Sequence, residues 1–260
     1  MATRVQDLLA GAREQLRFEP TPKRIRALSG DRTVVDSRAA VLVWEPRRVV
    51  PSYAVPEADL VGDLVPDERP APEGRPGILT PRDPFTLHST PGGSLTVRLP
   101  ERDLVGAAFR PADPDLAGMV VLDWTAFDQW LEEDQQAIGS PRDPFSRIDC
   151  LPTDRHVVVS HRGLVLADTR RAIVLFETGL SPRYYIPRED VATDLLVPTD
   201  SHTVCAYKGR ASYWSASVGD ETLPDVVWSY EEPLHDGLPV KGLLAFYTER
   251  LELTVDGVGL

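Results

Sequence analysis

Two stretches of this chain repeat each other, and the repeat constrains the fold more than any other feature of the sequence. Residues 36–45 and 168–177 are identical or similar in kind at nine of ten positions. With one inserted residue, residues 51–60 then match residues 182–191 in the same order. A repeated order of segments is typical of duplicated structural units. The sequence therefore predicts two related domains, and 260 residues are enough for two separate hydrophobic cores.

Each copy has the residue pattern of a β-meander. Two short β-rich runs precede the shared aspartate, Asp36 or Asp168, and an apolar run follows it. An aromatic strand then ends at a proline, which cannot extend a hydrogen-bonded ladder. Short strands at close spacing predict a mainly β fold of antiparallel sheets rather than alternating strands and helices. In the second copy the expected strands are 156–160, 164–167, 172–176, 183–186, 203–206, 212–218, 226–230 and 243–246.

Two helices are expected outside the sheets, because two segments place apolar residues at helical spacing. In the N-terminal segment these residues are Val5, Leu8, Leu9, Ala12 and Leu16. In the segment near the domain junction, after Asp123 as a candidate N-cap, they are Trp124, Phe127, Trp130 and Leu131. Each helix is expected to cover the first domain.

Proline and glycine indicate where the domains end. Residues 139–145 contain two prolines and a glycine, which suit an extended linker. We therefore expect a first domain over residues 1–140, a linker over 141–153 and a second domain over 154–260. Within the first domain, residues 66–77 are too rich in proline, glycine and charge to pack, so they are expected to form a surface loop or a disordered arm.

Charge and hydropathy exclude several classes of partner. Asp and Glu total 40 against 28 for Lys and Arg, and the net charge of −12 disfavours nucleic acid and anionic lipid. No apolar run is long enough to span a membrane and the first residues lack the apolar segment of a secretory signal, so a soluble cytoplasmic protein is expected. Cys150 and Cys205 have no Cys or His neighbours at ligand spacing, so the sequence predicts no disulfide, metal or other cofactor.

The residues that could carry chemistry are concentrated in the second copy. Residues 203–215 hold Cys205, Lys208 and three aromatic side chains, whereas the corresponding residues 87–97 have no Cys, Lys or aromatic residue. Six of the seven tyrosines follow residue 180. The sequence therefore predicts a functional site in the second domain and a divergent first domain without one.

The second copy resembles a known family through a series of motifs. These motifs occupy residues 177–179, 184–191, 205–214, 228–230 and 245–247. They resemble the bacterial domain-of-unknown-function 427 family over nearly all of residues 154–252, and the first copy shares the resemblance over 33–64 only. The resemblance implies a β-tent, in which two antiparallel sheets lean together over a cavity, as in methionine sulfoxide reductase B and the thalidomide-binding domain of cereblon.

Two properties linked to that family and its fold relatives find no support in these residues. The fold relatives hold zinc through paired Cys-x-x-Cys motifs, which this chain lacks. The family is in places labelled nucleotidyltransferase-like, yet neither a catalytic Gly-Ser with spaced aspartates nor a phosphate-binding glycine-rich loop is present.

Cys205 and Lys208 are the candidate catalytic residues. Cys205 could be a nucleophile activated by a nearby cation, or a buried free thiol that behaves as a small hydrophobic residue. The Lys208–Gly209 step reads as a strand ending in a turn, where the ammonium could bind a ligand at a cavity rim or be a solvated turn lysine. Arg188 is expected to pair with Glu177.

Aromatic side chains are the candidate binding residues, because they supply rigid amphipathic surface for a small-molecule pocket. Adjacent members of a pair must face opposite sides of a strand, so only about half of them can line one cavity. The alternative is ordinary packing within the sheets. The full set of candidate ligand-binding residues is Tyr184, Tyr185, Arg188, Tyr207, Lys208, Gly209, Tyr213, Trp214, Trp228 and Tyr230.

Three functions are compatible with these residues. The leading hypothesis is a binding module for a small apolar or aromatic molecule, with Tyr185, Tyr213, Trp214 and Trp228 around a pocket and Lys208 at its mouth. The second is an enzyme that uses Cys205 and Lys208 in thiol-based or transferase chemistry. The third is an adaptor that recruits another protein.

Overall fold

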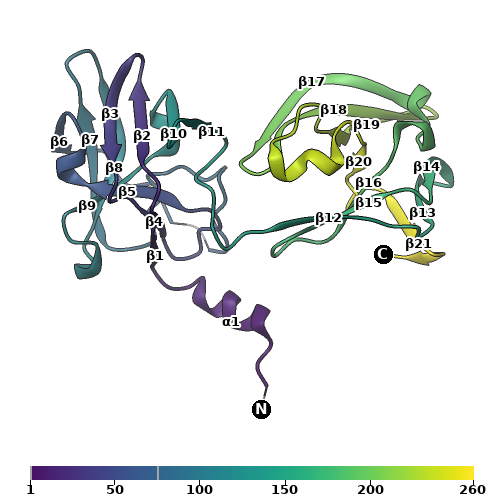
Figure 1. Cartoon of the computed structure of the whole chain (residues 1–260), viewed down its shortest axis with the longest axis horizontal. Coiled ribbons are helices and arrows are strands. Elements are labelled where there is room, and N and C mark those ends of the chain that lie inside the picture. Colours follow the sequence, from purple (N-terminus) through teal and green to yellow (C-terminus); the bar gives the residue numbers. More distant parts are fainter. Residues whose placement is uncertain (1, 75) are drawn as a thin grey trace. The chain divides into compact units, whose positions relative to one another are not determined.

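The computed structural model describes residues 2–74 and 76–260, which form two compact units, Met1–Asp143 and Pro144–Leu260 (Figure 1). Both units are built from antiparallel sheets, so the predicted mainly β fold is confirmed. No helix within the described ranges is both long and apolar enough to cross a lipid bilayer.

The first unit contains two antiparallel sheets. The larger has the order β1 (Arg17–Pro20), β4 (Val41–Trp44), β5 (Ser52–Pro56), β9 (Met119–Leu122), β8 (Asp103–Pro111), β7 (Gly92–Arg98) and β6 (Asp63–Pro66). The smaller has the order β11 (Gln135–Ala137), β10 (Gln129–Glu132), β2 (Ile25–Ser29) and β3 (Arg32–Ser37). Apolar side chains from both sheets share one core, so each sheet covers one face of the other.

The second unit contains three sheets. Their orders are β12 (Ile148–Pro152), β15 (Ile173–Glu177) and β16 (Arg183–Tyr185); β14 (Leu164–Thr169), β13 (Val157–His161), β21 (Glu252–Val255) and β22 (Val258–Gly259); and β17 (Leu196–Cys205), β18 (Gly209–Val218), β19 (Glu221–Ser229) and β20 (Ala245–Phe246). Ile186 and Leu244 exchange backbone hydrogen bonds of 2.8 and 2.9 Å, which joins β16 to the side of β20.

The two units have matching strand orders. Each strand of the first unit has the same neighbours as the strand of the second unit whose number is higher by eleven, so that β4 corresponds to β15 and β7 to β18. The one difference is that β5 and β9 pair within a single sheet, whereas β16 and β20 belong to separate sheets joined by the short link at Ile186 and Leu244. A side-chain contact also recurs at repeated positions. The Ser37 hydroxyl donates to the Asp59 carboxylate at 2.6 Å, and the Thr169 hydroxyl donates to Asp190 at 2.6 Å.

The strands expected in the second copy all overlap observed strands, but β12, β21 and β22 were not anticipated. β12 lies inside the segment 141–153 that was expected to be a linker, and it pairs with β15 from Ile148 opposite Glu177 to Pro152 opposite Ile173. In the first unit, the described residues of the 66–77 insertion after Pro66 lie outside strands and helices and are mostly exposed.

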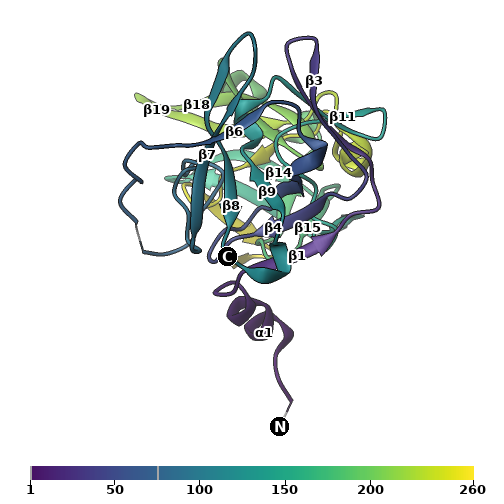
Figure 2. The same cartoon turned by 90° about the vertical axis from the view of Figure 1, so that its left-hand side faces the viewer.

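The N-terminal helix forms, but it does not cover the first unit. α1 spans Val5–Ala12 and has no buried residue, and it projects away from the sheets in both views (Figures 1 and 2). Leu8 is 65% exposed. Helical spacing therefore identified the helix correctly, whereas the inference that its apolar face packs on the domain was wrong.

The second expected helix is instead a short turn followed by a strand. The Asp123 carboxylate accepts the backbone N–H of Thr125 and begins the 3-10 helix η3 (Trp124–Ala126), not an α-helix. β10 then follows, and its buried Trp130 lies opposite Ala27 of β2. Apolar residues three or four apart fit one helix face, but the same residues reach the core here because pairing with β2 extends the chain.

Candidate functional site

A buried ion pair joins two strands of the second unit. Glu177 ends β15, and Lys208 lies in the turn between β17 and β18. The Lys208 ammonium lies 2.5 Å from the Glu177 carboxylate, and the two side chains are only 9% and 15% exposed. Lys208 is therefore not a solvated turn lysine, and its charge is matched inside the unit.

The turn that carries Lys208 is packed closely against the segment after β19. Gly209 has φ +100°, and a Cβ there would lie 3.2 Å from the backbone nitrogen of Leu234. That Leu234 N–H donates to the Lys208 carbonyl at 3.0 Å. Glycine suits both the left-handed backbone and the close approach, so the chain can turn Lys208 inward.

Four of the candidate aromatic residues pack together next to this ion pair. Tyr185, Tyr213, Trp228 and Tyr230 belong to one buried cluster, which we call the aromatic cluster. Tyr185 accepts a hydrogen bond from the Trp228 indole N–H at 3.2 Å. The Tyr213 hydroxyl lies 2.8 Å from that of Thr203. The cluster is therefore held by specific polar contacts as well as by apolar packing.

The neighbouring aromatic residues face the other way. Tyr184 and Trp214 pack in a separate core, as expected from the alternation of side chains along a strand. Trp214 therefore does not share a face with Tyr213. Tyr207 is half-buried in the turn before Lys208.

Burial also affects two hydroxyl groups of the aromatic cluster. It raises the pKa of Tyr185 and of Tyr230 far above that of a free phenol, and the nearby Glu177 carboxylate acts in the same direction. Both hydroxyls therefore keep their protons near neutral pH, so they can donate hydrogen bonds but cannot serve as bases.

Both cysteines lie at the edge of the aromatic cluster, and both are free. Cys150, on β12, was not among the candidate residues from the sequence. In the structure Lys208 is near enough to influence the pKa of its thiol. Burial raises the pKa of the Cys150 thiol, and the Lys208 charge opposes this only in part. Cys150 is therefore a protonated thiol at neutral pH, not an activated nucleophile.

Arg188 does not pair with Glu177, contrary to expectation. Its guanidinium lies 5.0 Å from the centre of the Trp214 ring, donates to the Gly242 carbonyl at 3.1 Å and contacts Glu231 at 3.4 Å. Glu177 is paired with Lys208 because the β17–β18 turn folds back over β15. The Arg188 contacts lie on the Trp214 side of the sheet, so the structure separates Arg188 from the aromatic cluster.

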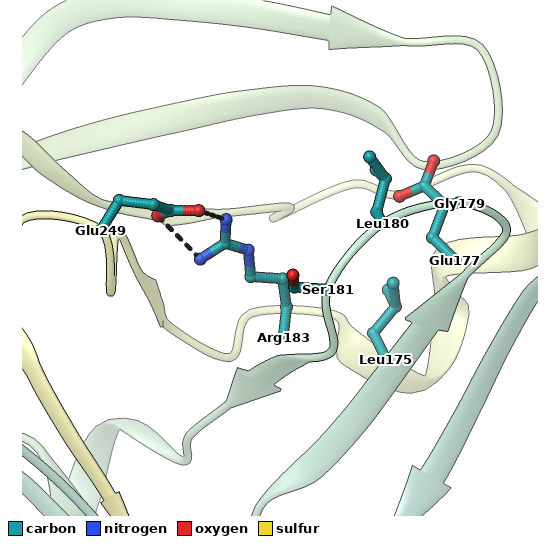
Figure 3. A pocket seen from close by; sticks show the side chains of 7 residues that line it. All are labelled: Leu175, Glu177, Gly179, Leu180, Ser181, Arg183 and Glu249. Atoms are coloured by element: carbon teal, nitrogen blue, oxygen red, sulfur yellow. Dashed lines mark hydrogen bonds and ion pairs between the residues drawn. The ribbon is translucent and has the colours of Figure 1, made fainter. Parts of the chain in front are cut away.

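A pocket of about 250 Å³ opens beside the ion pair (Figure 3). Arg183 and Glu249 lie on one side of it, and Leu175, Glu177 and Leu180 on the other. Its lining residues are Leu175, Glu177, Gly179, Leu180, Ser181, Arg183 and Glu249. None of the ten candidate ligand-binding residues lines this pocket. The motif at residues 177–179 was the one sequence signal that pointed to it.

Arg183 is held firmly at the pocket wall. Its guanidinium lies 5.7 Å from the centre of the Trp228 ring and donates to the Thr248 hydroxyl at 3.0 Å. It also pairs through both terminal nitrogens with the Glu249 carboxylate. The hydrogen bonds from Arg183 lower the pKa of Glu249, so this carboxylate is ionised at neutral pH.

The first unit has a comparable buried carboxylate, which the sequence comparison missed. Glu45 occupies the position that matches Glu177, and it is 3% exposed. It contacts His88 Nδ1 at 3.0 Å, accepts the Ser89 N–H at 2.8 Å and lies 3.6 Å from Arg48 Nε. The loop between β6 and β7 therefore supplies a histidine where the β17–β18 turn supplies a lysine. Comparing residue types alone could not reveal this, since His and Lys do not match.

The arrangement of titratable residues gives no support for a metal centre. Over the ranges 2–74 and 76–260, no three His, Cys, Asp or Glu side chains are grouped so that they could hold a metal ion. The polar groups at the site instead form matched pairs of opposite charge.

Comparison with known proteins identifies the second unit. A family model described as a domain of unknown function, DUF427, matches residues 149–257. No curated protein matches the chain. The resemblance indicated by the motifs is thus confirmed, and residues 149–257 form a domain of this family.

Proposed function

We propose that the DUF427 domain of this chain binds a small molecule in the pocket between Glu177 and Arg183. The observation that carries the proposal is the pocket of about 250 Å³, whose lining combines two leucines with charged side chains that are held in place by other residues. Small-molecule sites combine apolar walls with a few polar groups that fix the orientation of the ligand.

Preorganisation supports binding at this pocket. The Glu177 carboxylate is held by Lys208, which is 9% exposed, and the Arg183 guanidinium is held by Trp228 and Thr248. Groups that are already fixed lose little conformational freedom when a ligand arrives, so more of the interaction energy is available for affinity. Leu180 is exposed and offers the apolar surface between these two groups.

The aromatic cluster has a supporting role in this proposal. Tyr185, Tyr213 and Trp228 form a rigid layer behind the pocket, instead of lining it as the sequence led us to expect. This layer positions Arg183, because the guanidinium stacks on Trp228. The pocket therefore depends on the aromatic residues of the family motifs without exposing them to the ligand.

Binding is favoured over thiol catalysis by the state of the cations and thiols. The Lys208 ammonium, which could have activated Cys205, is engaged by Glu177. The pKa of Cys150 is raised, so this thiol is not a ready nucleophile either. We further propose that the first unit is a divergent copy of the same architecture, on the basis of the matching strand orders.

Fragment screening on the full chain tests the proposal. Ser181 is exposed and lines the pocket, so Ser181→Trp should block it without disturbing the core. Thr222→Trp on β19 is the control, because Thr222 is exposed and does not line the pocket. Fragments that raise the melting temperature of the wild type through mass action should lose this effect in Ser181→Trp and keep it in Thr222→Trp. A panel with no stabilising fragment, or with stabilisation unchanged by Ser181→Trp, would rule out the pocket.

A further inference from the structure

We infer that the ligand of this pocket is a small carboxylic acid whose carboxylate replaces that of Glu249 on Arg183. The inference rests on the proposed function, since it specifies the chemical class bound at the same pocket. It follows from an asymmetry between the two partners of the Arg183–Glu249 pair, of which one is fixed and the other is free to leave.

Arg183 is the fixed partner. Its side chain is 22% exposed, and it is held by the Trp228 ring and by the Thr248 hydroxyl as well as by Glu249. Removing Glu249 from the pair leaves the first two contacts in place. The guanidinium would then present its terminal nitrogens to the pocket in the fork geometry that matches a carboxylate.

Glu249 is the partner that can leave. Its side chain is 59% exposed and belongs to the loop after β20. An exposed carboxylate can turn into water at small cost, because exposed ion pairs contribute little net stability. Glu249 thus acts as an internal stand-in for the ligand, with its carboxylate on both terminal nitrogens of Arg183.

The opposite wall defines the rest of the ligand. Leu180, which is 64% exposed, lies across the pocket from Arg183 with the buried Leu175 beside it, so the body of the acid should be short and apolar (Figure 3). Glu177 adds no unmatched negative charge there, because Lys208 pairs with it. An anion can therefore enter without meeting an uncompensated carboxylate once Glu249 has moved.

Three molecules of similar shape test the charge requirement. Isovalerate carries a carboxylate, isoamyl alcohol a neutral hydroxyl and isoamylamine an ammonium on closely similar branched bodies. Binding to the full chain can be followed by ligand-observed NMR and by isothermal titration calorimetry. Isovalerate should bind at least about tenfold more tightly than the other two, because only it can form the paired charge-assisted hydrogen bonds with Arg183.

Variants of the ion pair then test the exchange. Glu249→Gln removes a competitor tethered beside the site, so it should tighten isovalerate binding about tenfold. Glu252→Gln is the matched control, because it removes an exposed carboxylate that bonds Ser160 and does not line the pocket, and affinity should not change. Arg183→Met should abolish the preference for isovalerate while isoamyl alcohol binds as in the wild type, which also shows that the pocket still folds.

The outcomes separate this inference from the proposed function. Isovalerate that binds no more tightly than isoamyl alcohol, or that is unaffected by Glu249→Gln, overturns the carboxylic acid as ligand. In that case, stabilisation by other fragments that Ser181→Trp blocks would still uphold the pocket as a binding site. Failure of every fragment and of all three probes would overturn both.

Discussion

The Lys208→Met substitution should destabilise the second unit strongly, because it leaves the Glu177 carboxylate without its partner. Removing one member of a buried ion pair costs about 3–5 kcal/mol. The Glu177 side chain is 15% exposed and borders the pocket, so water can reach part of it. We therefore expect a loss at the lower end, about 3 kcal/mol, which lowers the urea midpoint by about 1–2 M.

Thiol labelling reports this loss from the second unit alone. The only cysteines of the chain are Cys150 and Cys205, and both are partly buried beside the aromatic cluster. A pulse of thiol reagent at each urea concentration therefore measures unfolding of this unit, whereas tryptophan fluorescence would mix signals from both. Lys241→Met is the matched control, since Lys241 is exposed in the same unit, and its free energy of unfolding should change by no more than about 0.5 kcal/mol.

A double substitution separates the charge from the packing. Adding Glu177→Gln to Lys208→Met removes the unpaired charge, so the double variant should recover about 2 kcal/mol of the loss. The reasoning is refuted if Lys208→Met costs less than about 1 kcal/mol, or if the double variant is less stable than the single one.

Four further predictions follow from particular contacts. Hydrogen bonds from two hydroxyl groups lower the pKa of Asp225 in the folded protein. The ionised carboxylate therefore adds stability above the pKa of the unfolded state, and this stability is lost as the pH falls through the pKa of the folded state. Asp225→Asn should lower the urea midpoint at pH 7, and the difference between this variant and the wild type should vanish in acid. Tyr185→Phe leaves the Trp228 N–H without its acceptor and should cost about 1–3 kcal/mol by thiol-labelled unfolding. Glu45→Ala should cost about 3 kcal/mol or more in the first unit, measured by hydrogen exchange of its strands. Leu8→Gln should change the melting temperature very little, because α1 has no buried residue.

Local patterns predicted much of the sheet structure. The repeat located β15 and β16 and their counterparts β4 and β5, because apolar and β-branched runs ended by proline are signals from neighbouring residues. Alternation along a strand also predicted that Tyr184 and Tyr185 face different cores, which the structure confirms.

Spacing alone could not distinguish a helix from a turn and strand at residues 124–131. Trp124, Phe127 and Trp130 satisfy the helical pattern, and in the structure the same residues belong to η3, its C-cap and β10. The deciding interaction is the pairing of β10 with β2, whose residues lie about a hundred positions earlier. Long-range pairing overrides local preference in this way when it completes a sheet over the core.

The sequence by itself determined which residue types are available: a lone lysine in a motif, a set of aromatic residues and a repeated glutamate. Tertiary structure decided how they pair, by bringing Lys208 to Glu177, His88 to Glu45 and Arg183 to Glu249. The partners in these pairs lie 31, 43 and 66 positions apart. A buried charged side chain pairs with whichever hydrogen-bonding or oppositely charged group the loops bring within reach, and loop paths depend on the packing of the whole sheet.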